Sequence, residues 1–316
     1  MKATSNILKA ACIGLLLMMT VKVKAQYDAM FTQYMFNEMF INPAYAGSKD
    51  AMAFNALHRQ QWVNFPGRPI TTTASLHGPI VNEHMGLGIS FLNEKIGVLN
   101  RNLAYVTYAY RMKAGKNGKL AFGLMAGIHN QMNKFSTLKT NDEGDVQLIQ
   151  NSPNVTAPNF GFGIYYNDKV NYVGLSIPRM IDDRVIFDAS GGVTKITKME
   201  PSKFHYYLTF GRVFTLTDEL KLKGQAMIKA VQNAPLQYEI NANFLIKELI
   251  WAGLSYRSGD AASAILGVQV NPYFVVSYAY DYSLSKMQKY TSGSHEIALG
   301  YIFVYKGKKI VTPRYF

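Results

Sequence analysis

The last part of the chain, residues 272–305, alternates large apolar side chains with small or polar ones over two consecutive segments. In the first segment the apolar residues stand at every second position: Phe274, Val276, Tyr278, Tyr280, Tyr282 and Leu284. The second segment repeats the pattern with Ile297, Leu299, Tyr301, Phe303 and Tyr305. Because successive side chains of a strand point to opposite faces, the pattern predicts a β-hairpin with one apolar and one polar face.

Segments of the same kind recur through the chain, and with the final hairpin they make about fourteen predicted strands. The others span 51–62, 70–78, 85–91, 103–112, 120–130, 160–166, 170–177, 203–214, 220–231, 237–246, 250–256 and 262–270. In a soluble protein the apolar face of such a sheet needs a covering layer, and the chain has no segment left to provide one. The sequence therefore predicts an all-β, transmembrane antiparallel β-barrel over residues 49–305, covered by lipid.

The connections between the predicted strands alternate in length. The long ones are 131–157, 178–201 and 285–294, and the short ones are 113–118, 167–169, 215–219, 247–249 and 271–272. Outer-membrane barrels have an even number of strands, short periplasmic turns and longer extracellular loops. The alternation therefore favours an outer-membrane barrel whose two ends lie on the periplasmic side.

The chain begins with the features of a secretory signal peptide. Lys2 and Lys9 precede an apolar run at 10–19, and a small residue, Ala25, follows at the expected cleavage point. The apolar run is too short to cross a bilayer as a helix. We therefore expect residues 1–25 to be removed on export. Cys12 is the chain's single cysteine, so the mature protein has no disulfide, thiol nucleophile or thiolate metal site.

Residues 26–48 lack the period of two that marks the strands. Phe31, Tyr34, Met35, Glu38 and Met39 are spaced as on a helix, and Asn42 with Pro43 would end that helix. The segment is too short to cross a membrane and too apolar to be exposed to water. We predict that it forms an N-terminal plug-like segment in the mouth or lumen of the barrel.

Charged residues occur within the predicted strands, at positions opposite the apolar face. A charge that faces lipid costs about 2–4 kcal/mol at the bilayer midplane, so these side chains are predicted to face the interior. Whether they line an open pore or hold the plug-like segment is left open by the sequence. The predicted lumen-facing charges are Arg111, Lys221, Lys223, Lys229, Glu239, Lys247 and Asp281, together with Arg59.

Other kinds of site are not favoured, and we expect neither an enzyme nor a cofactor. The histidines lack the spacing of a helical metal site, and the acidic residues at 141–145 lack the ligand spacing of a calcium hand. The Gly-X-Gly sequences at 86–88 and 161–163 do not open a helix, as a dinucleotide site requires.

The net charge is +13, but no basic cluster interleaves with aromatic residues, so nucleic acid is not an expected partner. A membrane-embedded hydrolase is a third hypothesis, although His129 and His205 fall on the interior face.

Five short motifs carry a resemblance to a known family. They are FTQYMFN at 31–37, INPAYAG at 41–47, RQQW at 59–62, SYAYD at 277–281 and GSHEI at 293–297. Together they resemble the PorP/SprF family, outer-membrane proteins of the type IX secretion system of Bacteroidota. On these motifs the resemblance points to contacts with the plug or with a partner at Phe31, Gln33, Tyr34, Asn42, Pro43, Tyr45, Gly47, Arg59, Gln61 and Trp62.

The resemblance implies a fourteen-strand barrel similar to fatty-acid-transporter-like porins. It also implies a non-enzymatic role in the export or surface anchoring of a particular adhesin or gliding protein, recognised through its C-terminal domain. The implied partners are that cargo protein, periplasmic ring or peptidoglycan-linked components of the machinery, and outer-membrane lipid. The alternative function is a passive porin or a transporter of hydrophobic solutes.

The C-terminal end departs from the family pattern. Members of the family tend to end near the position of Phe303, whereas this chain continues through a basic arm, residues 306–316, that contains Lys306, Lys308 and Lys309. An even number of strands would place this arm in the periplasm. Our hypothesis is that the arm contacts a periplasmic partner.

Overall fold

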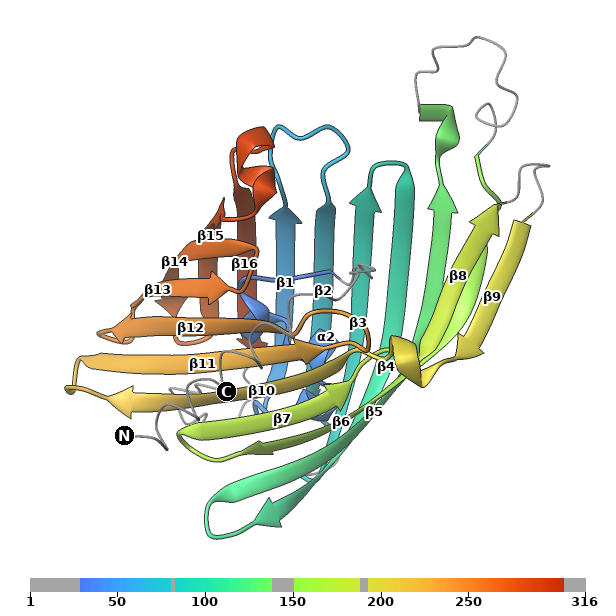
Figure 1. The fold of residues 1–316 in the computed structure, drawn as a ribbon. Coiled ribbons are helices and arrows are strands. Elements are labelled where there is room, and N and C mark those ends of the chain that lie inside the picture. The colour runs from blue at the N-terminus through green and yellow to red at the C-terminus, as the bar shows by residue number, and fades with distance from the viewer. Residues whose placement is uncertain (1–28, 81–82, 138–150, 188–192, 304–316) are drawn as a thin grey trace, which may run out of the picture.

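The computed structural model describes residues 29–80, 83–137, 151–187 and 193–303. Fourteen strands form one closed barrel, in which all neighbours are antiparallel (Figure 1). The barrel is closed by β1 (Met52–Gln60) and β16 (Ser294–Phe303), which pair from Met52 opposite Phe303 to Gln60 opposite His295. The predicted fourteen-strand antiparallel barrel is therefore confirmed.

The other strands of the barrel follow one another in chain order. The first group is β2 (Ile70–Pro79), β3 (Met85–Ile96), β4 (Leu99–Ala114), β5 (Gly118–Asn133), β6 (Val155–Asn167) and β7 (Asn171–Ile177). The second group is β10 (Tyr206–Thr215), β11 (Leu220–Ala230), β12 (Gln237–Ile246), β13 (Ile250–Arg257), β14 (Ala261–Asn271) and β15 (Phe274–Ser283). Short 3₁₀ turns lie in three connections: η3 (Phe135–Thr137), η4 (Pro201–Lys203) and η5 (Lys286–Tyr290).

The connections define two different rims. The rim that we call the short-turn rim has the connections 80–84, 115–117, 168–170, 216–219, 247–249 and 272–273, together with both ends of the barrel sheet. The opposite rim, which we call the long-loop rim, has the connections 61–69, 97–98, 134–154, 178–205, 231–236, 258–260 and 284–293. The three longest connections are all on the long-loop rim, as the sequence predicts.

Two regions near the long-loop rim contain more strand than predicted. Strands β3, β4 and β5 extend beyond their apolar parts, and β3 and β4 meet in a tight connection at residues 97–98. Polar cross-strand pairs such as Glu94 with Arg101 support this extension, and in the sequence such residues are typical of a loop. The expected loop 178–201 contains a separate two-stranded sheet of β8 (Ile181–Phe187) and β9 (Val193–Met199). β-branched residues such as Ile181 and Thr197 favour an extended chain there.

Side chains alternate between the two faces of the barrel wall. On β15, Tyr278 and Tyr282 are exposed on the outer face, while Ser277, Ala279 and Asp281 are buried on the inner face. Among the residues whose burial the structure describes, Leu254 has the most exposed large apolar side chain, with 70% of its surface accessible. It points outward, where the membrane lipid covers the barrel. Among the described residues, no helix has the length and apolar character needed to cross a bilayer.

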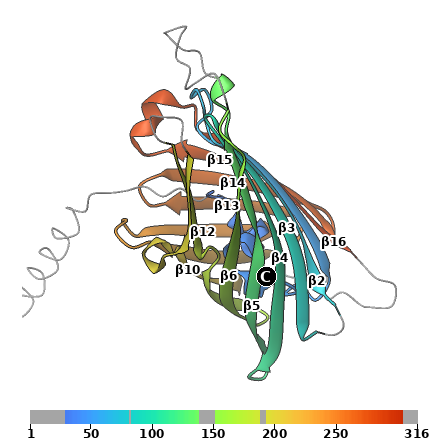
Figure 2. The same cartoon turned by 90° about the vertical axis from the view of Figure 1, so that its right-hand side faces the viewer.

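Residues 29–48 lie inside the barrel, and we call them the plug segment (Figure 1 and Figure 2). They form three short turns of helix: η1 (Tyr34–Phe36), α2 (Glu38–Ile41) and η2 (Pro43–Tyr45). The helix α2 ends where predicted, because Asn42 is extended and its side chain accepts a hydrogen bond from the backbone N–H of Ala44. Tyr34, Ala44 and Ala46 have no exposed surface, which shows how completely the strands enclose the segment.

Candidate functional site

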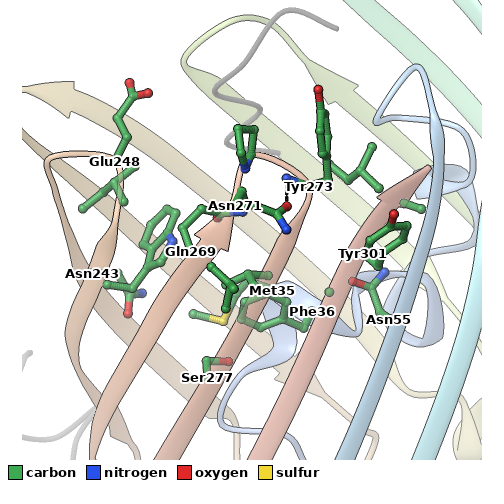
Figure 3. A pocket seen from close by; sticks show the side chains of 18 of the residues that line it. Met35, Phe36, Asn55, Asn243, Glu248, Gln269, Asn271, Tyr273, Ser277 and Tyr301 are labelled. Carbon is green, nitrogen blue, oxygen red and sulfur yellow. Dashed lines mark hydrogen bonds between the residues drawn. The ribbon is translucent and has the colours of Figure 1, made fainter. Parts of the chain in front are cut away.

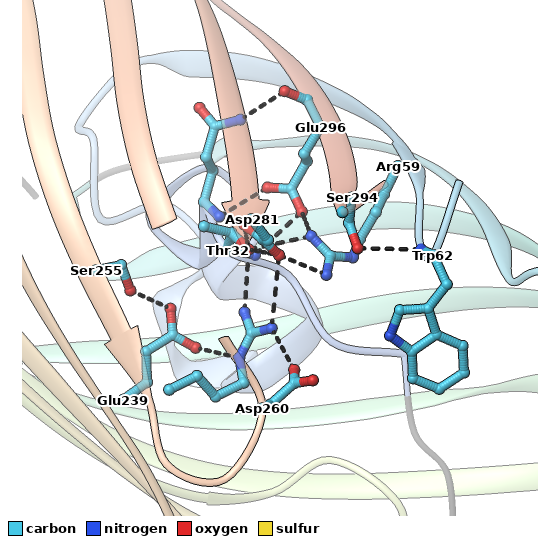
Figure 4. A network of polar contacts seen from close by, with 12 residues as sticks. Thr32, Arg59, Trp62, Glu239, Ser255, Asp260, Asp281, Ser294 and Glu296 are labelled. Carbon is cyan, nitrogen blue, oxygen red and sulfur yellow. Dashed lines mark hydrogen bonds and ion pairs between the residues drawn. The ribbon is translucent and has the colours of Figure 1, made fainter. Parts of the chain in front are cut away.

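The plug segment is bonded to the barrel wall at its N-terminal end. The backbone N–H groups of Thr32 and Gln33 donate to the two Oε atoms of Glu296, at 3.0 and 2.7 Å. The Thr32 hydroxyl lies 2.8 Å from the carboxylate oxygens of Asp281, to which it donates. Because Glu296 lies on β16 and Asp281 on β15, this end of the plug segment is attached to the strands near the closure of the barrel (Figure 4).

Arg59 of β1 balances these two carboxylates. Its Nη1 atom donates to Glu296 at 3.0 Å, and its Nη2 atom donates to Asp281 at 2.7 Å. Nη1 also donates to the Thr32 hydroxyl at 3.0 Å. All three charged side chains are at most 2% exposed. Buried charges are tolerated when they are paired and hydrogen-bonded, and the plug segment provides part of that bonding.

Arg257 of β13 extends the same cluster. Its Nε atom donates to Glu239 at 2.9 Å, Nη1 donates to Asp260 at 3.0 Å, and Nη2 donates to the Thr32 hydroxyl at 3.1 Å. The Thr32 hydroxyl therefore accepts hydrogen bonds from two arginines and donates one to Asp281. A hydroxyl group can donate one hydrogen bond and accept two, so this group is fully bonded. We call this cluster the anchor network: Thr32, Gln33, Arg59, Glu239, Arg257, Asp260, Asp281 and Glu296.

The middle of the plug segment makes hydrogen bonds to strands β6 and β7. The Asn42 side chain donates to the carbonyl of Ile164 at 2.9 Å, and the Ser176 hydroxyl donates to the carbonyl of Ile41 at 2.6 Å. Glycine residues on the inner face let the backbones approach here. A Cβ atom at Gly123 would overlap the backbone of Ala44.

The C-terminal end of the plug segment is attached near the short-turn rim. Arg111 of β4 donates to the backbone carbonyl of Gly47 and, at 2.9 Å, to the carboxylate of Asp50. Lys119 also pairs with Asp50, at 2.9 Å. The N–H of Gly47 donates to Nδ1 of His77 at 3.0 Å. Gly47 has a φ of +78°, and a Cβ there would lie 2.9 Å from the Cα of Gly86, so this position requires glycine.

An aromatic cluster packs between the plug segment and β6 and β7. The ring of Tyr45 meets that of Tyr165 edge-on at 5.6 Å, and Tyr165 stacks on Tyr172 at the same centroid distance. The hydroxyl of Tyr165 donates to Glu38 of the plug segment at 3.4 Å. Burial raises the pKa of the Tyr45 phenol well above its usual value, so this ring stays neutral.

Glu38 is the acidic group of the plug segment. Burial raises the pKa of its carboxyl group, while the nearby Lys223 and Lys49 oppose that rise. A group whose pKa is raised by folding contributes stability below its unfolded pKa, about 4.3 for glutamate. That contribution is lost as the pH increases through the higher folded value.

We therefore expect Glu38→Gln to change how stability depends on pH. The unfolding temperature of the parent protein, relative to that of Glu38→Gln, should fall as the pH rises from about 4.3. Heat-induced loss of strand circular dichroism between acidic and neutral pH measures it, with the exposed Glu83→Gln as the matched control. A constant difference across this range would contradict the assignment.

The structure places the predicted contact residues of the plug inside the lumen. Those in the plug segment are all buried: Phe31, Gln33, Tyr34, Asn42, Pro43, Tyr45 and Gly47. Arg59 joins them through the anchor network. Gln61 and Trp62 lie in the connection between β1 and β2, where the N–H of Trp62 donates to the Ser294 hydroxyl at 3.1 Å.

The structure places five of the predicted lumen-facing charges on the inner face of the wall. Those buried on the inner face are Arg111, Lys223, Lys229, Glu239 and Asp281. Lys221 is partly buried and pairs with Glu248. Lys247 lies just beyond the inner face of the wall, because β12 ends at Ile246 and Lys247 belongs to the turn that follows. Its side chain is 66% exposed at the short-turn rim and lies 3.5 Å from Glu219.

Some parts of the site were missed or lie elsewhere. The sequence prediction ends a strand at Tyr256 and so misses Arg257, although Ser255 and Arg257 continue the inward alternation. Glu296 was also missed as a site residue, although it lies in the motif at 293–297. The leader (1–25) and Lys306, Lys308 and Lys309 lie outside the described residues. The described part of the chain holds no cluster of three or more potential metal ligands.

Comparison with known sequences identifies the family. Residues 23–301 match the profile described as "Type IX secretion system membrane protein PorP/SprF". The chain belongs to this family. The match covers the plug segment and almost the whole barrel, and with the closed barrel it supports an outer-membrane location for this PorP/SprF protein. No functionally curated protein matches the chain in sequence.

Solved structures with a similar fold include a channel, a transporter and a FadL homologue. The CymD monoaromatic hydrocarbon channel is 11% identical with a TM-score of 0.49, and the match covers 90% of this PorP/SprF chain and 95% of CymD. The Ralstonia pickettii toluene transporter TbuX is also 11% identical with a TM-score of 0.49, over 84% and 93%. A Pseudomonas aeruginosa FadL homologue is 11% identical with a TM-score of 0.45, over 83% and 93%. At these values the likeness concerns the barrel and not its ligands.

Proposed function

We propose that this PorP/SprF protein is a non-enzymatic component of the type IX machinery that binds a particular secreted protein. It recognises the C-terminal domain of that cargo and supports its export or its anchoring at the cell surface, as in adhesion or gliding motility. Residues 1–25 act as a cleaved signal peptide, and the arm 306–316 contacts a periplasmic ring or peptidoglycan-linked component. The short-turn rim faces the periplasm in this proposal, because outer-membrane barrels have short turns there.

The observation that carries the proposal is the attachment of the plug segment inside the lumen. A passive pore needs an open lumen, whereas here charged groups of the inner wall bind the chain's own residues. Arg59, Asp281 and Glu296 are used in this way near the barrel closure, and Arg111 is used near the short-turn rim. Family membership supports a role with protein cargo, and the filled lumen supports binding over passive diffusion.

The proposal can be tested against the passive porin or hydrophobic-solute transporter. We expect the affinity-tagged barrel, purified from its native membrane, to retain a secreted protein. The isolated C-terminal domain of that protein should bind the purified barrel, and cargo without this domain should not be retained. In planar bilayers the parent barrel should conduct little, whereas a variant without residues 29–48 should conduct. Steady conductance of the parent, with no bound protein in the native preparation, would contradict the proposal.

A further inference from the structure

A cavity of about 500 Å³ lies between the plug segment and the barrel wall (Figure 3). Met35 and Phe36 of the plug segment form one side, and inner-face residues of β1 and β12–β16 form the other. Glu248 and Tyr273, from two adjacent turns, place its mouth at the short-turn rim. Its volume is in the range of binding sites for small molecules and short peptides.

The wall of this cavity is apolar, unlike the inner face around the anchor network. Leu245, Trp251, Val275 and Ile302 occupy inward positions on β12, β13, β15 and β16. The sequence carries a signal for this patch, because each of these residues adjoins an outward-facing apolar residue, as in Ile250-Trp251. The alternation thus fails on neighbouring strands at one end of the barrel. An apolar wall that the plug segment leaves uncovered favours an apolar occupant.

Polar groups stand among the apolar ones. The Ser277 side chain lies in the cavity, is 4% exposed, and its hydroxyl has no hydrogen-bond partner among the described residues. Asn55 and Asn243 add amide groups from strands on two sides. A register shift between Gln269 and Asn271 brings two further amide side chains to the mouth. Amides can both donate to and accept from a peptide backbone, and they are spread around the patch instead of gathering at one point.

The ionisable groups that line the cavity are mainly basic. The lining lysines are Lys49, Lys223 and Lys247, and the lining carboxylate is Glu248. Two acids outside the lining lie close to these lysines: Glu38 is near Lys49 and Lys223, and Glu219 is 3.5 Å from Lys247. A ligand with a carboxylate is therefore electrostatically favoured over one with a cationic group.

We propose that this cavity binds an extended peptide segment that has aliphatic or aromatic side chains and a carboxylate. The segment enters from the short-turn rim, packs its apolar side chains on Trp251 and Val275, and bonds to the Ser277 hydroxyl. This proposal deepens the proposed function. It rests on that function for the source of the segment, which is the secreted cargo protein. The binding chemistry itself can be tested on the purified barrel alone.

Trp251 allows a direct binding assay. The chain has two tryptophans, Trp62 and Trp251, so Trp62→Phe leaves Trp251 as the only reporter. The barrel is placed in lipid nanodiscs and titrated with an acetylated hexapeptide that alternates phenylalanine with serine and ends in a free carboxylate. We expect a saturable blue shift of the Trp251 emission. The same peptide with a C-terminal amide should bind about 2- to 5-fold more weakly.

Two substitutions at Ser277 separate cavity binding from adsorption. Ser277→Phe fills the cavity and should weaken binding at least about tenfold. Ser277→Ala keeps the cavity and should weaken binding about 3- to 10-fold through loss of one hydrogen bond. The matched control Ala264→Phe adds the same ring to the outer face of β14 and should bind as the parent does. Heat-modifiable migration in gel electrophoresis verifies that each barrel is folded.

Each outcome decides the inference. Equal binding by the parent, Ser277→Ala and Ala264→Phe would overturn it, as would the lack of any saturable shift. A shift with lauric acid but not with the peptide, if abolished by Ser277→Phe, would replace the peptide by a fatty-acid ligand. If the peptide binds as expected while native purification yields no cargo, the proposed function fails and the peptide site stands. If cargo is retained equally by the parent and Ser277→Phe, the proposed function stands and the cavity is not its site.

Discussion

Replacing Arg59 by methionine is expected to release the plug segment from the lumen. The substitution leaves Asp281 and Glu296 buried without their main counter-ion, and these side chains are 2% and 0% exposed. Breaking a buried ion pair by removing one partner costs about 3–5 kcal/mol, because the remaining charge is uncompensated. Both carboxylates also bond to Thr32 or Gln33, so moving the plug segment out lets water reach them.

Release can be measured by the accessibility of a cysteine introduced at Met39, which is 2% exposed in the lumen. In a Cys12→Ser background, Arg59→Met should make Met39→Cys react with a maleimide, and it should raise the conductance in planar bilayers. Arg68→Met is the matched control, since Arg68 lies in the connection between β1 and β2, away from the anchor network, and its Nη2 atom donates to Gln60 at 3.5 Å. Adding Asp281→Asn and Glu296→Gln to Arg59→Met should restore protection in part. Unchanged protection in Arg59→Met would show that the anchor network does not hold the segment.

Replacing Gly123 by valine should have the second large effect. Gly123 faces inward on β5, and a Cβ atom there would overlap backbone atoms of Pro43 and Ala44. Backbone cannot move aside as a flexible side chain can, so the turn η2 would have to leave its place. Overpacking usually costs about 1–3 kcal/mol, and a clash with backbone belongs at the upper end of that range. We expect a lower unfolding temperature and maleimide labelling at Met39→Cys.

Gly224→Val is the matched control for this substitution. Gly224 faces outward on β11, and the nearest atoms to its added Cβ lie 3.9 Å away on Phe214 and 4.0 Å away on Arg212. This variant should unfold at the temperature of the parent and stay unlabelled. If Gly123→Val and Gly224→Val behave alike, the close approach of η2 to β5 does not determine the position of the plug segment.

The barrel could be predicted from the sequence because lipid imposes a strict rule on the outer face. Lipid on the outside requires every second residue of β15 and β16 to be apolar. The alternation therefore predicted correctly that Tyr278 and Ile297 face outward and that Asp281 faces inward. Strand ends were predicted less well where polar residues continue a strand beyond the lipid, as at Arg101. Arg257, at the end of β13, was missed for the same reason, because the predicted strand ends one residue earlier.

Partners within the lumen could not be predicted, because they depend on how distant strands are placed around the barrel. The alternation of side chains shows that Arg59 and Glu239 face inward. It does not show that the Thr32 hydroxyl bonds both to Arg59 and to Arg257, the partner of Glu239. The small sheet β8–β9 was missed because its strands lie outside the alternating barrel pattern. The cavity beside Trp251 was also missed, since residues that break the alternation look like irregular strand ends until the barrel closes around them.

The central claim is that the chain's own N-terminal segment occupies the lumen of a closed barrel. It is tested most directly by labelling Met39→Cys in a protein whose anchor network is intact. The folded barrel in the Cys12→Ser background is treated with a maleimide, with Lys116→Cys in an exposed turn as the positive control. We predict that position 39 stays unlabelled until the barrel is heat-unfolded, while position 116 reacts at once. Rapid labelling at both positions in the folded barrel would contradict the account.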